Sequence, residues 1–153
     1  AKSYLTIQQM RYYDILSYEF QVDEDITHFP ILAMTLQPLI ENAIYHGIKN
    51  KRGMGMISIS GYFENEHYII IKVKDNGIGI TAERLVEIQM NLLTYQQSTT
   101  DELEQQVQEH NGGFGLFNVH QRLRLYFGEP CGVMLESVYG EGACISLRIP
   151  RKK

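Results

Sequence analysis

The stretch LQPLIENAIYHG, Leu36–Gly47, has the pattern of an amphipathic helix whose buried side carries unusual polar residues. Its apolar residues recur at intervals of three and four, so they form one stripe that faces a core: Leu36, Leu39, Ile40, Ala43 and Ile44. Three polar side chains interrupt this pattern: Glu41, Asn42 and His46. Thr35 is suited to cap the helix and Gly47 to end it, and Pro38 is tolerated in the first turn. Helical periodicity alone does not explain why a carboxylate, an amide and an imidazole lie beside a core stripe.

Composition restricts the classes of protein to consider. The chain has 153 residues, 44% hydrophobic and 21% charged, which is typical of one soluble domain. A net charge of -4 gives no general attraction to nucleic acid or to anionic membranes. The only cysteines, Cys131 and Cys144, form no CxxC pair, and reduced thiols are expected. No apolar run is long enough to span a membrane, no signal peptide is recognisable, and the abrupt start inside a helical pattern indicates a fragment.

Hydrophobic periodicity predicts an alternation of helices and strands along the chain. Helices are expected over 4–16, 36–47, 81–93 and 112–128. Strands are expected over 18–22, and in two hairpins over 54–63 with 68–75 and over 131–140 with 142–150. An acidic turn at 23–25 and a polar stretch over 94–111 separate some of these elements. This order predicts an α+β fold, a two-layer sandwich with helices on one face of a mainly antiparallel mixed sheet.

A second informative segment is VKDNGIGI, Val73–Ile80, where a strand ends at an acidic residue. Gly77 and Gly79 allow the backbone to approach a flat ligand, and Ile80 with its neighbouring isoleucine provides apolar walls. Asp75 at the rim of such a slot can accept a hydrogen bond from an exocyclic amine, as on adenine. Taken alone, the same residues also fit an ordinary turn after a strand.

The third segment is GGFGLFNV, Gly112–Val119, where glycines precede a helix. The free N–H groups and the dipole of a helix N-terminus favour phosphate, although a glycine at a helix start is also a common flexible cap. Asn42 offers an amide oxygen, which Mg²⁺ accepts together with phosphate oxygens and water. An asparagine on a helix is, however, often only a solvated polar residue.

The three segments, in this order, resemble the ATP-binding domain shared by gyrase, a class of heat-shock chaperones, histidine kinases and MutL mismatch-repair proteins, known as the Bergerat fold. LQPLIENAIYHGI, VKDNGIGI and GGFGLFNVHQRLRLYFG look like the catalytic domain of sensor histidine kinases of the LytS/YesM kind. YLTIQQMRYYDILSYEF is similar to the segment that follows the phosphoacceptor helix in that family. The resemblance implies that residues 1–17 end that segment and that residues 18–153 form the catalytic domain, with an ATP lid at about 94–111.

The resemblance also implies a role for each candidate residue. Asn42 would coordinate the Mg²⁺ that bridges the ATP phosphates, and Asp75 would receive the adenine amine. The adenine slot would be shaped by Gly77, Gly79 and Ile80. The phosphates would be enclosed by Gly113, Phe114, Gly115 and Leu116. His46 would reach phosphate or the lid, and Glu41 is a candidate catalytic residue whose alternative role is to complement the helix dipole.

The chain departs from the family pattern at several positions. Relatives usually carry a phosphate-contacting lysine where Tyr45 stands, and Lys49, Lys51 or Arg52 are candidates to replace it. Relatives often carry a hydroxyl where Ala143 stands. None of the five histidines has the sequence context of a phosphoacceptor: His28, His46, His67, His110 and His120.

The favoured interpretation is therefore an ATP-binding catalytic domain of a two-component histidine kinase that positions Mg-ATP for transfer to a histidine on a separate dimerisation domain. The resemblance implies a downstream response regulator and a cytoplasmic location within a membrane-anchored sensor, and the net charge of -4 predicts no nucleic acid partner. An ATPase of the gyrase or chaperone type would need a general base one turn before Asn42, where Pro38 stands. A second alternative is a non-catalytic Bergerat-fold module that binds nucleotide or a partner.

Overall fold

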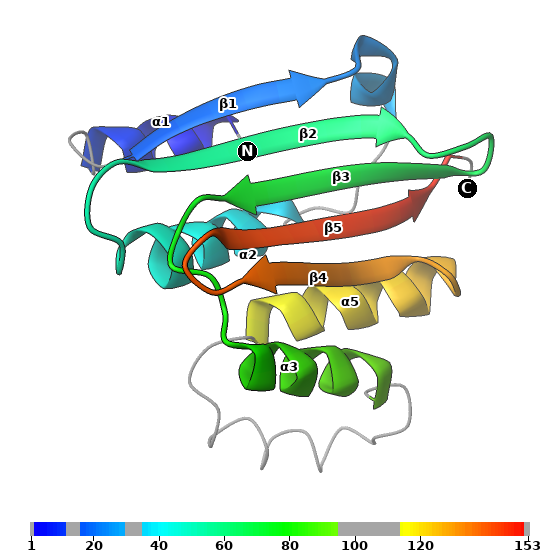
Figure 1. Cartoon of the computed structure of the whole chain (residues 1–153). Coiled ribbons are helices and arrows are strands. Elements are labelled where there is room, and N and C mark those ends of the chain that lie inside the picture. Colours follow the sequence, from blue (N-terminus) through cyan, green and yellow to red (C-terminus); the bar gives the residue numbers. More distant parts are fainter. Residues whose placement is uncertain (1, 12–15, 30–34, 95–113, 152–153) are drawn as a thin grey trace.

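The computed structural model describes residues 2–11, 16–29, 35–94 and 114–151. Figure 1 shows its elements, with a 3₁₀-helix (η1) and a π-helix (η2) among them. In chain order they are α1 (Lys2–Arg11), β1 (Leu16–Val22), η1 (Glu24–His28), α2 (Leu36–Asn42), η2 (Ala43–Ile48), β2 (Gly55–Phe63), β3 (Tyr68–Asp75), α3 (Ala82–Thr94), α5 (Phe114–Phe127), β4 (Gly132–Val138) and β5 (Gly142–Pro150). None of the helices in these ranges is long and apolar enough to cross a membrane.

The five strands form one mixed sheet in the order β1-β2-β3-β5-β4. β1 pairs with β2 in parallel, whereas the other three pairings are antiparallel. Both predicted hairpins are confirmed, since β2 pairs with β3 and β4 pairs with β5. The prediction of an α+β fold with a mainly antiparallel mixed sheet is therefore confirmed.

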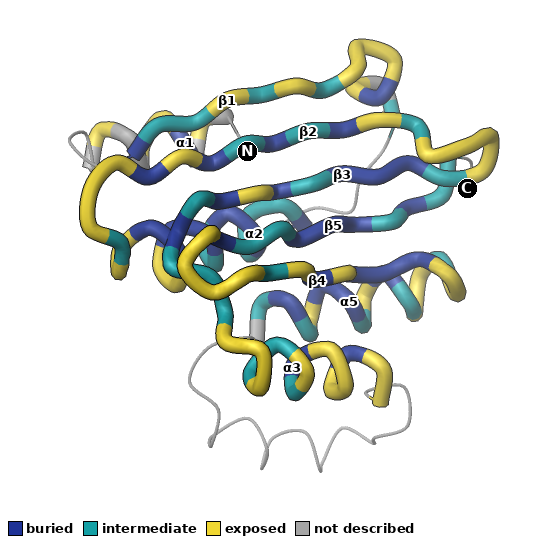
Figure 2. The backbone as a smooth tube through the Cα atoms, in the orientation of Figure 1, coloured by how far each residue is buried: buried dark blue, intermediate teal, exposed yellow. Residues whose placement is uncertain are grey.

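One face of the sheet packs on the helices and forms the core (Figures 1 and 2). In β2 the buried residues Ile57 and Ile59 alternate with the half-buried Ser58 and Ser60 on the opposite face. This period of two is typical of an antiparallel sheet with one covered face. The helices contribute buried residues to the same cluster, among them Leu39, Ile40, Ile44, Leu116 and Leu123. The two-layer sandwich predicted from the sequence is confirmed.

The prediction that the first helix continues to residue 16 was wrong. α1 ends at Arg11 within the described residues, and Leu16 instead begins β1, where it pairs in register with Gly55. Leu16 is buried in the core, so its pairing with β2 decides its conformation over any helical spacing in the sequence. The proposed division between residues 1–17 and 18–153 remains a prediction.

The prediction that Gly47 ends the second helix was also wrong. The α-helical part ends at Asn42, and the chain continues as the π-helix η2 to Ile48. The N–H of Lys49 donates to the carbonyl of Ile44 at 2.8 Å, five residues earlier, which is the π pattern. Thr35, predicted to cap the helix, makes no side-chain capping hydrogen bond there. Single π turns occur often at functional sites, and this one lies beside the predicted ligand slot.

A buried histidine joins α5 to the neighbouring strand β4. The N–H of Val133 donates to Nδ1 of His120 at 3.1 Å, and Nε of Arg124 lies 3.4 Å from Nε2 of the same ring. Arg124 also pairs with Glu129 at 3.0 Å. Burial, and next the charge of Arg124, lower the pKa of His120 from 6.5, so the ring is neutral in the folded protein at neutral pH.

We expect His120 to make the free energy of unfolding fall with acidification. As the pH falls, the unfolded chain protonates this histidine at a higher pH than the folded chain does. The contribution of the neutral ring to the free energy of unfolding is therefore complete above pH 6.5 and is lost as the pH falls through the folded-state pKa. Each unit of pKa difference corresponds to about 1.4 kcal/mol. Urea unfolding over a pH series measures the slope, and His120→Gln, whose amide oxygen can still accept from Val133, should reduce it. Equal slopes in the two proteins would contradict this role.

Candidate functional site

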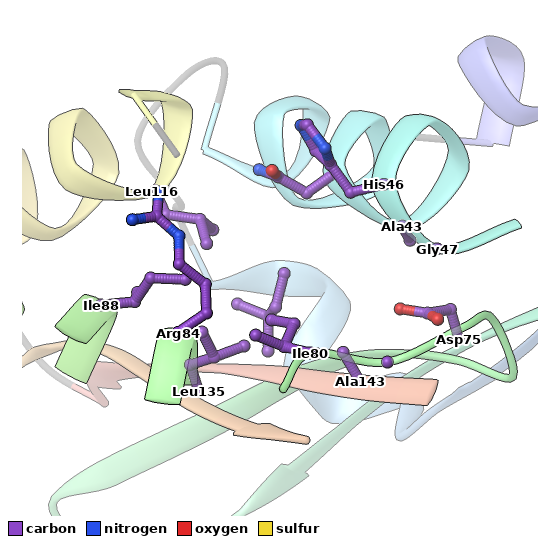
Figure 3. A pocket seen from close by; sticks show the side chains of 13 residues that line it. Ala43, His46, Gly47, Asp75, Ile80, Arg84, Ile88, Leu116, Leu135 and Ala143 are labelled. Atoms are coloured by element: carbon purple, nitrogen blue, oxygen red, sulfur yellow. The ribbon is translucent and has the colours of Figure 1, made fainter. Parts of the chain in front are cut away.

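A cavity of about 170 Å³ opens between the helices and the core face of the sheet. An apolar cavity of about 150 Å³ is known to bind benzene, so the space suits one aromatic ring system. Figure 3 shows Asp75 at one end of the cavity and Arg84, Ile88 and Leu116 at the other. The complete lining is Asn42, Ala43, His46, Gly47, Asp75, Gly79, Ile80, Arg84, Ile88, Leu116, Leu135, Ala143 and Ile145.

Asp75 is a buried carboxylate at the end of β3, and it forms the polar end of the cavity. The N–H of Gly77 donates to its Oδ1 at 2.8 Å, and the backbone N–H of Ala143 makes a second hydrogen bond with the carboxylate. Burial raises the pKa of Asp75, while these two N–H groups and the charge of Lys51 act in the opposite direction. The cavity therefore presents an oriented acceptor to any ligand that brings a donor.

Close approach of backbones holds this carboxylate in place. A Cβ at Gly47 would lie 2.5 Å from Oδ1 of Asp75, and a Cβ at Gly77 would lie 2.3 Å from the carbonyl carbon of Gly47. The N–H of Ile78 donates to the carbonyl of Gly47 at 3.2 Å, which joins the π-helix to the glycine turn. Gly79 adopts φ +69, a conformation that favours glycine. The turn predicted to approach a flat ligand is thus built on contacts that only glycine permits.

Asn42 is oriented by its own helix. Its Nδ2 donates to the carbonyl of Pro38 at 2.8 Å, one turn earlier. A side-chain amide that donates through nitrogen keeps its oxygen as a free acceptor or metal ligand. Asn42 lines the cavity, so that oxygen belongs to the site. Gly115 lies behind this pair, because a Cβ there would be 2.9 Å from Cβ of Pro38, and so permits α5 to approach α2.

The structure brings together most of the residues predicted to bind nucleotide, since one cavity is lined by Asn42, His46, Asp75, Gly79, Ile80 and Leu116. Gly77 and Gly115 support the walls without lining the cavity. Glu41 is also absent from the lining, and its Oε1 accepts a hydrogen bond from Nε2 of Gln37 at 2.9 Å.

Some predictions fall beyond what the structure describes. Gly113, His110 and the predicted lid after Thr94 lie outside the described residues, and so does the side chain of Phe114. Their assigned roles remain predictions.

Sequence reasoning missed several lining residues. Arg84 and Ile88 come from α3, and Leu135 and Ile145 come from β4 and β5. The three cations proposed to replace the missing lysine do not line the cavity. The spacing from Ile80 to Arg84 and on to Ile88, four residues each, is the signal that could have revealed the α3 wall.

The described side chains do not form a protein cage for a metal. Among the residues that the structure describes, no group of three or more His, Cys, Asp or Glu side chains converges. The free amide oxygen of Asn42 is a hard ligand of the kind that Mg²⁺ accepts. Mg²⁺ commonly uses few protein ligands together with phosphates and water, so these residues fit a metal that arrives with a nucleotide.

Comparison with known proteins identifies similar sequences. Residues 30–153 match the family described as histidine kinase-, DNA gyrase B-, and HSP90-like ATPase. The chain is 35% identical to the putative uncharacterized protein YwpD of Bacillus subtilis over 147 residues, covering 96% of this chain and 46% of YwpD. It is 32% identical to the sensor histidine kinase YpdA of Escherichia coli, covering 84% of this chain and 20% of YpdA. It is 30% identical to the sensor histidine kinase YesM of B. subtilis, covering 98% of this chain and 22% of YesM.

Solved structures share the fold. The blue-light activated histidine kinase of Erythrobacter litoralis EL346 aligns with a TM-score of 0.57 at 15% identity, covering 88% of this chain and 35% of that protein. The mycobacterial sensor histidine kinase MprB aligns with a TM-score of 0.54 at 14% identity, covering 95% of this chain and 88% of that structure. The chain spans less than half the length of these curated relatives YwpD, YpdA and YesM.

Proposed function

Because the chain belongs to the family of histidine kinase-, DNA gyrase B-, and HSP90-like ATPases, we propose that it is the ATP-binding catalytic domain of a two-component sensor histidine kinase. The observation that carries the proposal is the cavity itself, in which the buried acceptor of Asp75 and the free oxygen of Asn42 open into one space. The likeness to YpdA and YesM supports the kinase class among the family's members.

The proposed mechanism assigns one task to each part of the cavity. Asp75, held by two backbone N–H groups, accepts the exocyclic amine of adenine. Ile80, Leu135 and Ile145 enclose the base, which excludes water and strengthens that hydrogen bond. The phosphates extend past Asn42 toward the N-terminus of α5, where free N–H groups favour anions. When bound with the nucleotide, Mg²⁺ would neutralise phosphate charge, and Asn42 is the residue that would hold it.

The proposal extends to partners beyond this chain. The γ-phosphate is transferred to a histidine on a dimerisation and phosphoacceptor domain of the same protein, and from there to a response regulator. Fixing the phosphate in line with that acceptor supplies much of the rate acceleration. Within the cell, we place this domain in the cytoplasm as part of a membrane-anchored sensor.

A reconstitution experiment tests the proposal. We expect the 153-residue chain to bind ATP, to hydrolyse it very slowly, and to take up no label from γ-labelled ATP. Adding the dimerisation domain of the parent protein should then produce labelled histidine on the added domain. Rapid hydrolysis by the chain alone would favour the ATPase interpretation, and stable labelling of the chain would mean that one of its own histidines is an acceptor.

The geometry also bears on the two alternatives. Pro38, one turn before Asn42, offers no side chain that could activate water, which disfavours an ATPase of the gyrase or chaperone type. A non-catalytic module that binds only a protein partner would have no need for a cavity with an oriented carboxylate and amide, whereas one that binds nucleotide would fail the reconstitution experiment. Titration with ATP in the presence and absence of Mg²⁺ distinguishes that module from a kinase domain.

Asn42→Ala should remove most of the Mg²⁺ dependence of ATP binding and change metal-free ADP binding little. The reason is that Asn42 contributes a hard oxygen to the cavity, and its Nδ2 contact with Pro38 is local to the helix. A loss of about tenfold in Mg-ATP affinity is expected for one ligand bond to a charged group. The measurement is calorimetric titration with and without Mg²⁺, and Gln37→Ala, outside the cavity, is the control. If Mg²⁺ still raises the affinity of the variant to the parental extent, the metal is held elsewhere.

A further inference from the structure

The cavity contains a positively charged side chain that family resemblance does not assign. Among the described residues that line it, Arg84 on α3 carries the permanent positive charge. Figure 3 shows Arg84 at the end occupied by Ile88 and Leu116, away from Asp75. A nucleoside polyphosphate carries several negative charges, and moving them into a partly enclosed site needs compensation.

The cations nearer to the second helix serve other contacts. Nζ of Lys51 donates to the carbonyl of Asn76 at 2.7 Å, which ties it to the turn that follows Asp75. Nζ of Lys49 lies 5.6 Å from the centroid of the Tyr45 ring. Arg52 is exposed, and none of these three cations lines the cavity. The charge of Lys51 acts instead on Asp75, at the end that receives the base.

Arg84 shares its end of the cavity with a second source of positive potential. Leu116 is the third residue of α5, so the lining there belongs to the first turn of a 14-residue helix. The N–H groups of a first turn have no intrahelical acceptor, and the helix dipole adds positive potential. A guanidinium and a helix N-terminus therefore border the same space, opposite the carboxylate.

The ion pair of Arg84 leaves it able to bind a ligand. Nη1 lies 2.6 Å from Oε2 of Glu87, and the two side chains are 35% and 42% exposed. Pairs of this exposure contribute about 0–1 kcal/mol, and a guanidinium has five donors. Glu87 thus holds Arg84 on the α3 wall without consuming its capacity to donate.

We propose that Arg84 contacts the polyphosphate of the bound nucleotide. It supplies the positive charge that relatives usually supply with a lysine at the position of Tyr45. This inference rests on the proposed nucleotide-binding function and adds one binding residue to it. Asp75 with Lys51 serves the base, and Arg84 with the N-terminus of α5 serves the phosphates. The two ends of the cavity consequently have opposite charge, matched to the two ends of the ligand.

The test compares ATP with adenosine, which presents the same base and ribose without phosphate. Arg84→Met should weaken ATP binding to the 153-residue chain about tenfold and leave adenosine binding unchanged, because one charged hydrogen bond is lost. Arg84→Lys should be intermediate, since it keeps the charge without the fork. The salt dependence of ATP binding should also be smaller in Arg84→Met. Arg52→Met, which removes an exposed cation outside the cavity, is the matched control and should bind both ligands as the parent does.

Three outcomes would overturn the inference. An unchanged ratio of ATP to adenosine affinity in Arg84→Met would mean that the guanidinium does not meet phosphate. Equal losses for both ligands would mean that Arg84 only supports the wall of the cavity. A selective loss of ATP binding in Arg52→Met would assign the contact to that cation. These three outcomes refute the role of Arg84 alone. A parental chain that binds neither ATP nor adenosine would instead refute the proposed nucleotide-binding function.

Discussion

Asp75→Asn is expected to lower the affinity for ATP, ADP and adenosine together, by about 10- to 100-fold, and to leave the chain folded. The carboxylate accepts from the N–H groups of Gly77 and Ala143 and has capacity for one more donor from a ligand. An asparagine amide replaces one acceptor oxygen by a donor, so the exocyclic amine of the ligand is left without an acceptor. Such a mismatch in a buried site costs about 1–3 kcal/mol.

The same substitution should preserve or increase the free energy of unfolding at neutral pH. Burial raises the folded-state pKa of Asp75, so the ionised carboxylate costs stability at neutral pH, and this cost disappears as the pH falls through the folded-state pKa. A neutral amide avoids the cost at every pH. Calorimetric titration and urea unfolding of the same preparations measure both effects. Unchanged nucleotide affinity would remove Asp75 from the base-binding end, and unfolding of the variant would assign it a structural role instead.

Gly77→Ala is expected to impair both the fold and the site. The new Cβ would lie 2.3 Å from the carbonyl carbon of Gly47 and 2.6 Å from Oδ1 of Asp75. Neither the backbone nor the carboxylate can move without displacing the other wall of the cavity. We expect a loss of about 3 kcal/mol in the free energy of unfolding, at the upper end of overpacking effects. Nucleotide affinity should fall by at least about tenfold, because Asp75 must leave its present position.

A second glycine provides the control for this variant. Gly128 has φ +72, and a Cβ added there would meet no atom within 4 Å, so Gly128→Ala introduces backbone strain without a clash. That strain costs about 1–2 kcal/mol and lies at the end of α5, away from the cavity. Thermal unfolding and ATP titration should therefore separate the two variants. Parental ATP affinity in Gly77→Ala would mean that the contact between Gly47 and Gly77 does not position Asp75.

The sequence alone predicted the elements whose information is local. The hairpin of β2 and β3 followed from β-branched residues around a polar turn, and Asp75 followed from its place between a strand and two glycines. Asn42 was predicted from the order of three segments, because no local pattern distinguishes a ligand from a solvated amide. Its orientation by Pro38 needed the structure.

Features that depend on tertiary packing could not be predicted in the same way. The π-helix contacts the glycine turn through Gly47 and Ile78, which are distant in sequence, so no pattern within Leu36–Gly47 predicted it. Leu16 fits a helical spacing and takes a strand only because β2 pairs with it. Arg84 belongs to the site because α3 packs on β4; the four-residue spacing of Ile80, Arg84 and Ile88 indicates a shared face but not which part of the fold that face borders.

The parallel pairing of β1 with β2 has a consequence for the order in which the protein folds. Two parallel neighbours cannot be joined by a tight turn, so the chain between Val22 and Gly55 must cross over the sheet, and α2 and η2 lie within that crossover. Closing such a long connection costs chain entropy before the contacts between β1 and β2 can compensate for it. The pairing of β1 with β2 should therefore form more slowly than the hairpins of β2 with β3 and β4 with β5. Asn42 and His46 lie in this crossover, so they reach the cavity only when a pairing less local than either hairpin has formed. The hairpin that ends in Asp75 can assemble first, and the helical wall that carries Asn42 and His46 joins it later, although the edge strand β1 on which that crossover depends lines no part of the cavity.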